Sequence, residues 1–136
     1  MRFMLRLLAL VLLVLPASAL AIEVCGSGPR LNCVVDGDTF WWEGEKIRAM
    51  GYDTPEPTSN VCGGDVEREL ARKATARLVE LFNTTKISIE RHGKDKYGRT
   101  LAVVRSNGWQ IGDILVGEGL ARAWPDGCEF WCQTCN

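Results

Sequence analysis

The stretch NCVVDGDTFWWEGEKIRAM, residues 32–50, decides the fold class. Residues 32–35 and 39–42 are rich in β-branched and aromatic side chains, which favour strands. The turn-forming residues Glu43-Gly44-Glu45 follow, and apolar and polar side chains then alternate over residues 46–50. The stretch therefore predicts three short consecutive strands.

Further along the chain the hydrophobic period changes to that of a helix. Apolar residues recur at spacings of three and four, with charged residues between them: Leu70, Ala74, Leu78, Leu81 and Phe82. This pattern predicts an amphipathic helix over residues 65–82.

The remainder of the chain predicts two more strands and a second, shorter helix. The strands are expected at residues 86–90 and 100–105, on either side of a polar loop at 92–99, and the helix begins near Ile111. Five short strands with a long helix between the third and the fourth are typical of a small barrel of the OB type. We therefore expect an α+β fold, a five-stranded OB-type β-barrel with two to three helices.

The N-terminus has the layout of a secretory signal peptide over residues 1–21. Basic residues precede an apolar run at residues 7–15, and Pro16 is followed by small residues that suit cleavage. The run is shorter than the roughly 20 apolar residues that a membrane span needs. We expect a single domain over residues 22–136, in a secreted or periplasmic protein that has no membrane contact after cleavage.

All the cysteines lie in this expected domain, and three of them are in its C-terminal tail. They are Cys25, Cys33, Cys62, Cys128, Cys132 and Cys135. An even number in a small exported chain favours disulfides, and the sequence leaves their pairing open. The spacing in the tail also matches that of some iron–sulfur sites, but those enzymes are large and work in reducing compartments. We therefore expect disulfides.

Two acidic clusters carry the candidate chemistry, Asp36-Gly37-Asp38 and Asp53-Thr54-Pro55-Glu56. Either cluster alone could be an ordinary turn, because Asp, Gly and Pro favour turns. An EF-hand that began at Asp36 would need a glutamate where Ile47 stands, so that calcium loop is excluded. The net charge of −1 gives no sign of a nucleic-acid partner, so such a partner must be argued from the site.

Two arginines give the acidic clusters a chemical meaning. Arg48 lies near the end of the third predicted strand, shortly before the second cluster, and Arg99 is the last residue of the polar loop. Carboxylate oxygens bind calcium-like ions, and guanidinium groups neutralise charge on phosphate oxygens. A further carboxylate can position or deprotonate the attacking water. These are the groups needed to hydrolyse a phosphodiester.

The order and spacing of residues 34–40, 47–56 and 95–102 resemble the staphylococcal nuclease (thermonuclease) family, and residues 115–121 are similar to its second helix and exit. The resemblance implies an OB-type barrel and a Ca²⁺-dependent nuclease acting on DNA, with RNA as a further substrate. No obligate protein partner is implied. The alternative is a non-catalytic module of the same fold that binds nucleic acid or protein.

Residue by residue, the resemblance implies three groups of site residues. The implied calcium ligands are Asp38, Asp53 and Thr54, with Asp36 close to the ion. The implied catalytic residues are Arg48 and Arg99 on the phosphate and Glu56 on the attacking water. The implied substrate-binding residues near the terminal phosphate are Lys96 and Tyr97.

The sequence departs from the longer family members after the second predicted helix. Those members have tyrosines that stack on a base, followed by a third helix, whereas this chain has Trp124 and a short cysteine-rich tail. Trp124 either replaces the stacking aromatic, and so binds substrate, or packs in the core. We expect the disulfides to replace the stability that the third helix would supply.

Overall fold

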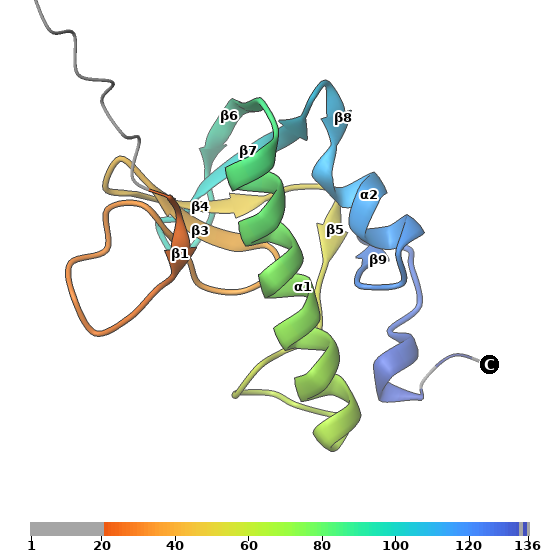
Figure 1. Cartoon of the computed structure of the whole chain (residues 1–136). Helices are drawn as coiled ribbons and strands as arrows, with labels where there is room; N and C mark the ends of the chain where they lie inside the picture. Colours follow the sequence, from red (N-terminus) through yellow and green to blue (C-terminus); the bar gives the residue numbers. More distant parts are fainter. Residues whose placement is uncertain (1–20, 134, 136) are drawn as a thin grey trace, which may run out of the picture.

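The computed structural model describes residues 21–133 and 135 (Figure 1), so the predicted signal peptide lies, apart from its last residue, outside the described residues. The elements are β1 (Glu23–Val24), β2 (Cys33–Val34), β3 (Thr39–Trp42), β4 (Glu45–Ala49), β5 (Tyr52–Asp53), α1 (Gly64–Thr84), β6 (Ile87–Lys94), β7 (Thr100–Ser106), β8 (Trp109–Gln110), α2 (Ile111–Gly117), β9 (Arg122–Ala123) and the 3-10 helix η1 (Phe130–Cys132). None of the helices in this part of the chain combines the length and the apolar character of a membrane span.

The strands form one mixed sheet and one small two-stranded sheet. In the large sheet the order is β1-β2-β3-β4-β7-β6, with β8 beside β7, and the second sheet pairs β5 with β9. The β1–β2 and β4–β7 pairs are parallel and the others are antiparallel. Helices and sheets together make an α+β fold. The path ends at β1 and β6, so closure of the predicted barrel is not confirmed for the described residues.

The predicted strands correspond to β2, β3, β4, β6 and β7, and one predicted loop is partly wrong. Strand β6 continues to Lys94, three residues into the loop expected at 92–99. It can do so because β7 still offers a partner, Thr100, after an irregularity between Arg91 and Lys94 where Gly93 has φ +92°. The four unpredicted strands have two residues each, too short for an alternating pattern.

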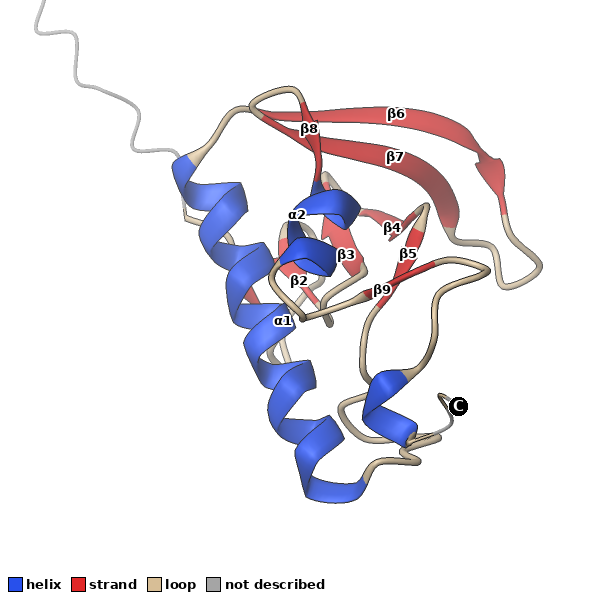
Figure 2. Cartoon of the chain, turned by 90° about the vertical axis from the view of Figure 1, so that its right-hand side faces the viewer, coloured by secondary structure: helices blue, strands red, loops and turns tan. Residues whose placement is uncertain are grey.

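The predicted first helix is confirmed as α1, and its apolar face forms one wall of the core. Figure 2 shows α1 along one side of the molecule. The ring of Phe82 meets Phe40 of β3 edge-on at 4.8 Å and Trp42 at 5.9 Å between centroids. The core continues through Leu78 of α1 and Leu115 of α2, which are fully buried. Packing of both helices on the sheet therefore fixes the strands that carry the site.

The C-terminal tail is tied back to the start of α1. The cysteines pair as Cys25–Cys33, Cys62–Cys132 and Cys128–Cys135, which confirms the predicted disulfides and gives the pairing. Trp131 of η1 is buried, and a Cβ added at Gly63 would overlap its carbonyl group. Figures 1 and 2 both place η1 beside the N-terminal end of α1. The tail thus covers the loop that leads into this helix.

Candidate active site

A tight turn between β2 and β3 fixes Asp38, the first predicted calcium ligand. Asp36 Oδ1 accepts the backbone N–H groups of Asp38 at 3.1 Å and Thr39 at 2.8 Å. A Cβ added at Gly37 would lie 2.7 Å from Thr54 Cγ2, so a side chain larger than hydrogen does not fit there. The Asp-Gly-Asp sequence therefore holds the turn against the chain segment that carries the second acidic cluster.

Asp38 is a buried and well hydrogen-bonded carboxylate. Its Oδ2 accepts the backbone N–H of Thr54 at 3.1 Å and the hydroxyl of the same residue at 3.0 Å. Burial, and then the charge of Asp36, raise the pKa of Asp38 from 3.8 to about 6, although Arg48 and the Thr54 amide act in the opposite direction. At neutral pH the carboxylate is therefore ionised at a free-energy cost, which a nearby cation would reduce.

Arg48 joins Asp38 to Asp53, the second predicted calcium ligand. Its Nη2 lies 3.3 Å from Asp38 Oδ2 and 3.2 Å from Asp53 Oδ1. Its Nη1 donates to the carbonyl groups of Ala49 at 2.7 Å and Tyr52 at 3.2 Å. The guanidinium of β4 is thus oriented by the backbone around β5, and its positive charge lies between the two acids.

These acids have the chemistry that a hard divalent cation requires. Asp38 and Asp53 direct oxygens to one cationic nitrogen, and the pKa of Asp38 is raised first by burial and then by the charge of Asp36. Carboxylate and carbonyl oxygens are the ligands that calcium prefers. Thr54, whose carbonyl is the third predicted ligand, is hydrogen-bonded to Asp38 through its amide and hydroxyl. The predicted ligands therefore have the chemistry that suits a hard divalent cation, and calcium as that cation stays a prediction.

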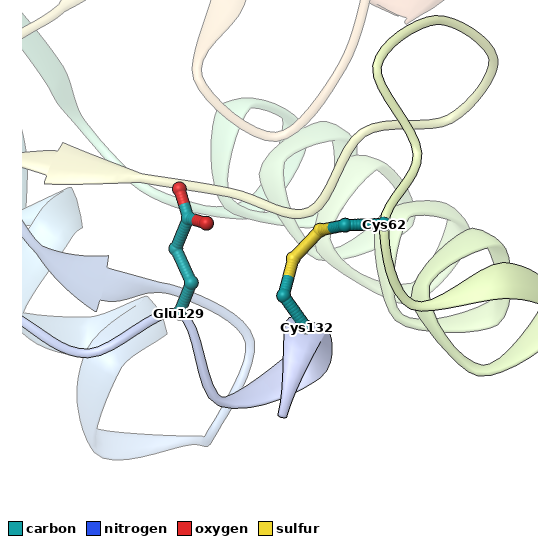
Figure 3. Close-up of side chains that lie close together, drawn as sticks. All are labelled: Cys62, Glu129 and Cys132. Carbon is teal, nitrogen blue, oxygen red and sulfur yellow. A yellow bond between two sulfur atoms is a disulfide. The ribbon is translucent and has the colours of Figure 1, made fainter. Parts of the chain in front are cut away.

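A second cluster of potential ligands does not suit a metal ion. Among the described residues, one group of three acidic, histidine or cysteine side chains has its ligand atoms within 4.8 Å of one another: Cys62, Glu129 and Cys132 (Figure 3). The two sulfur atoms are joined as a disulfide. Metal ions bind cysteine as the thiolate, which neither residue offers in this state.

Glu56, the predicted base, lies in the electrostatic field of the other acids. Its side chain is half-buried, and its pKa is raised by burial and then by the charges of Asp38 and Asp53. A carboxylate with a raised pKa accepts a proton more readily than an exposed one. The backbone N–H of Glu56 donates to Glu67 Oε1 at 3.0 Å, which anchors the loop at this residue.

Glu67 is a buried residue of the site that sequence reasoning missed. Its Oε2 accepts the N–H groups of Cys62 and Gly63, both at 2.7 Å. Burial opposes ionisation, but these bonds and the one from Glu56 hold the pKa of Glu67 below its usual value. One carboxylate thus ties the whole loop to α1. The sequence signal that could have identified Glu67 is its position four residues before Ala71, on the same buried face of α1.

The second predicted phosphate arginine is held by its own loop. Arg99 Nε donates to Asp95 Oδ2 at 2.7 Å, and its backbone N–H donates to Asp95 Oδ1 at 3.0 Å. The Arg99 guanidinium lies 5.5 Å from the centre of the Tyr97 ring, and Lys96 Nζ lies 5.0 Å from the same ring. The loop therefore presents two positive charges around one exposed aromatic ring.

A groove of about 340 Å³ brings the predicted phosphate and substrate residues together. Its lining includes Arg48, Lys96, Tyr97, Arg99 and Trp124. Trp124 is 55% exposed, so it is not a core residue and can contact a ligand in the groove. The acids of the predicted calcium site and Glu56 do not line the groove, and the contact between the two regions runs through Arg48.

A second residue that sequence reasoning missed, Arg122, lies beside Asp53. Its Nη2 is 2.9 Å from Asp53 Oδ2. The two residues are separated by most of the domain in sequence, and only the pairing of β5 with β9 brings them together. No local motif could therefore have identified Arg122.

Comparison with known proteins gives consistent matches. The family model described as staphylococcal nuclease homologue matches residues 46–128, a range that includes every predicted site residue except Asp36 and Asp38. A thermonuclease of Staphylococcus intermedius is 31% identical over 115 residues, which cover 79% of this chain and 66% of the relative. Endonuclease YncB of Bacillus subtilis is 36% identical over 100 residues, 68% of this chain and 46% of the relative.

A more distant match extends further along the chain. An uncharacterized endonuclease of Haemophilus influenzae is 27% identical over 128 residues, 90% of this chain and 65% of the relative. The chain thus spans between about half and two thirds of the length of these relatives. The match over residues 46–128 confirms the family predicted from the motifs: the chain belongs to the staphylococcal nuclease homologues.

Proposed function

We propose that this protein is a Ca²⁺-dependent nuclease, exported from the cell, that hydrolyses phosphodiester bonds of DNA and also accepts RNA. The observation that carries the proposal is the position of Arg48. It contacts both predicted calcium ligands, Asp38 and Asp53, and it lines the same groove as Arg99. A phosphate in this groove would meet two guanidinium groups directly beside a cation site. The disulfides agree with an oxidising compartment.

The chemistry assigns a separate task to each residue. Glu56 accepts a proton from the water whose oxygen attacks phosphorus. The bond from phosphorus to the leaving oxygen breaks, and that oxygen takes a proton from the solvent. Arg48 and Arg99 neutralise the charge that grows on the phosphate oxygens in the transition state. A calcium ion held by Asp38, Asp53 and the Thr54 carbonyl would add positive charge at the same oxygens.

The substrate would lie along the groove with its bases against the exposed aromatic rings. Tyr97 is 71% exposed and Trp124 is 55% exposed, so each offers an aromatic face to an unpaired base. Stacking on such a face contributes roughly 1–3 kcal/mol per base, whatever the base. Lys96 adds a positive charge beside the terminal phosphate. This arrangement favours single-stranded nucleic acid over a duplex, whose bases are already stacked.

The rival proposal is a non-catalytic module that binds nucleic acid in the same groove. It would need no base and no cation, whereas this chain retains Glu56 with a raised pKa beside Asp38 and Asp53. We therefore favour the enzyme, and a cleavage assay separates the two proposals.

The test uses the oxidised protein with labelled single-stranded DNA, and RNA in parallel, in calcium or in EGTA. We expect cleavage in calcium alone, and a loss of about 100-fold or more in Arg48→Lys and Glu56→Gln. The control is Arg105→Gln, because Arg105 pairs with Glu90 at 3.1 Å on β6 and β7, away from the groove. A wild type that binds DNA but leaves it intact in calcium would support the binding module instead.

A further inference from the structure

The side chain of Arg122 lies against a predicted calcium ligand. Arg122 of β9 is the direct cross-strand partner of Asp53 in β5. Its Nε donates to Asp53 Oδ2 at 3.0 Å, and its Nη2 lies 2.9 Å from the same oxygen. Because a guanidinium is planar and rigid, two donors to one oxygen restrict rotation of the carboxylate.

The C-terminal tail holds Arg122 from its other side. Arg122 Nη2 lies 2.7 Å from Glu129 Oε1, and Nη1 donates to the carbonyl of Gly127 at 3.0 Å. The guanidinium also lies 5.0 Å from the centre of the Trp124 ring. All three nitrogens thus have protein acceptors, and the side chain is only 13% exposed. Arg122 is therefore committed to the protein and is not a free phosphate ligand.

The two oxygens of Asp53 consequently face different partners. Oδ2 is taken by Arg122, while Oδ1 lies 3.2 Å from Arg48 Nη2, the nitrogen that also contacts Asp38. The side of the carboxylate that Arg122 leaves open is thus the side that faces the other predicted ligand. We propose that Arg122 is a positioning residue which, held by Glu129 of the tail, fixes Asp53 with its Oδ1 directed towards Asp38.

The tail can do this because it is itself anchored. Glu129 and Cys132 extend from the same side of the tail, and Cys132 is joined to Cys62 in the loop that precedes α1 (Figure 3). Trp131, between them, is buried beside Gly63. The tail therefore places Glu129 at a fixed point relative to the loop that follows the second acidic cluster. The cysteine-rich end of this chain takes part in shaping the site as well as in stabilising the fold.

This inference rests on the proposed function, and it makes a separable prediction about cation binding. Arg122→Lys keeps the positive charge, so the Coulomb effect on a cation stays, but it loses the planar pair of donors to Asp53. Partners that orient metal ligands typically change affinity or activity by about 10- to 100-fold when they are replaced. A weaker affinity in this variant would therefore report lost orientation of the carboxylate.

The experiment compares Arg122→Lys, Glu129→Gln and the double variant with the control Arg105→Lys. Arg105 forms an ion pair with Glu90 away from the site. Calcium chloride is titrated into each oxidised protein by calorimetry, and kcat and KM are measured on single-stranded DNA. We expect Arg122→Lys to weaken calcium binding about 10-fold or more and to lower kcat with KM unchanged. Glu129→Gln should act in the same direction, and the double variant should be no worse than Arg122→Lys.

Several outcomes would overturn the inference. Calcium affinity and kcat equal to the control in both single variants would show that Arg122 does not position Asp53. A loss confined to KM would show that Arg122 contacts the nucleic acid instead. If Arg122→Lys does not fold, Glu129→Gln still decides, because it leaves the contact between Arg122 and Asp53 in place. A wild type that binds calcium but cuts no nucleic acid would refute the proposed function alone, since the calcium titration still tests the positioning role.

Discussion

Replacing Glu67 by glutamine tests how one buried carboxylate organises the loop that carries Glu56. The two side chains have nearly the same shape, but glutamine has one acceptor oxygen and one amino group. In the native protein both carboxylate oxygens are used. Oε1 accepts the N–H of Glu56, and Oε2 accepts the N–H groups of Cys62 and Gly63. In the variant, the NH₂ group of the glutamine must therefore face a backbone N–H group, so that two donors meet.

The expected loss of unfolding free energy follows from this count of hydrogen bonds. If the amide oxygen remains with Cys62 and Gly63, the N–H of Glu56 loses its acceptor, and the opposite rotamer leaves two N–H groups without one. A buried donor left unsatisfied costs about 1–3 kcal/mol. We therefore expect Glu67→Gln to lower the free energy of unfolding by about 1–3 kcal/mol at pH 7. It should also lower kcat, because Glu56 loses its anchor.

The assay is urea denaturation in EGTA, followed by tryptophan fluorescence at pH 7 and again near pH 4. The pKa of Glu67 is depressed in the folded protein, so its contribution to stability is present above the usual value of 4.5 and is lost as pH falls through the lower folded value. The difference between wild type and Glu67→Gln should therefore shrink in acid. The control is Glu69→Gln, because the side chain of Glu69 on the same helix is 45% exposed and pairs with Arg72 and Lys73 instead of with backbone N–H groups. Equal stability of the two variants at pH 7 would show that the hydrogen bonds of Glu67 do not stabilise the loop.

Three further predictions concern other parts of the site. The pKa of Asp38 is about 6 in place of 3.8, so ionising this side chain costs the folded protein about 3 kcal/mol at about 1.36 kcal/mol per pH unit. Asp38→Asn should therefore stabilise the calcium-free protein at pH 8 and not at pH 4. A lower free energy of unfolding of the variant at pH 8 would contradict this. Replacing both Cys62 and Cys132 by alanine opens a loop with a sequence separation of 70 and should lower unfolding free energy by about 4 kcal/mol; an unchanged melting temperature would show that the disulfide adds nothing. Trp124→Ala should raise KM for single-stranded DNA by roughly 5- to 150-fold, as expected for a stacking loss of about 1–3 kcal/mol, with little change in kcat. An unchanged KM would show that no base stacks on Trp124.

The elements that the sequence predicted well are those that local patterns determine. The apolar spacing in α1 and the alternation in β3 and β4 reflect which side of each element is buried, and that pattern is contained in a few turns or residues. The acidic clusters and Arg48 were identified for a similar reason. They lie on consecutive strands and turns, so their spacing along the chain largely determines their spacing in the site.

The features that the sequence did not predict arise from contacts between distant segments. Arg122 meets Asp53 only because β5 pairs with β9, and the disulfide pairing depends on where the tail docks. Glu67 has its role because the loop before α1 folds back over its carboxylate. Strand β6 continues past the predicted boundary because β7 still offers a hydrogen-bonding partner. Such pairings are settled by packing, which no local pattern encodes.

The calcium dependence of cleavage is tested most directly by measuring cleavage and calcium binding on the same preparation. The rate of hydrolysis of single-stranded DNA is measured as free calcium is raised from EGTA to saturation, and the dissociation constant for calcium is obtained by calorimetry. We expect cleavage to be lost in EGTA and to rise with half-saturation near the calorimetric constant. In Asp53→Asn we expect both cleavage and cation binding to disappear. Cleavage that persists unchanged in EGTA, or in Asp53→Asn, would contradict this expectation.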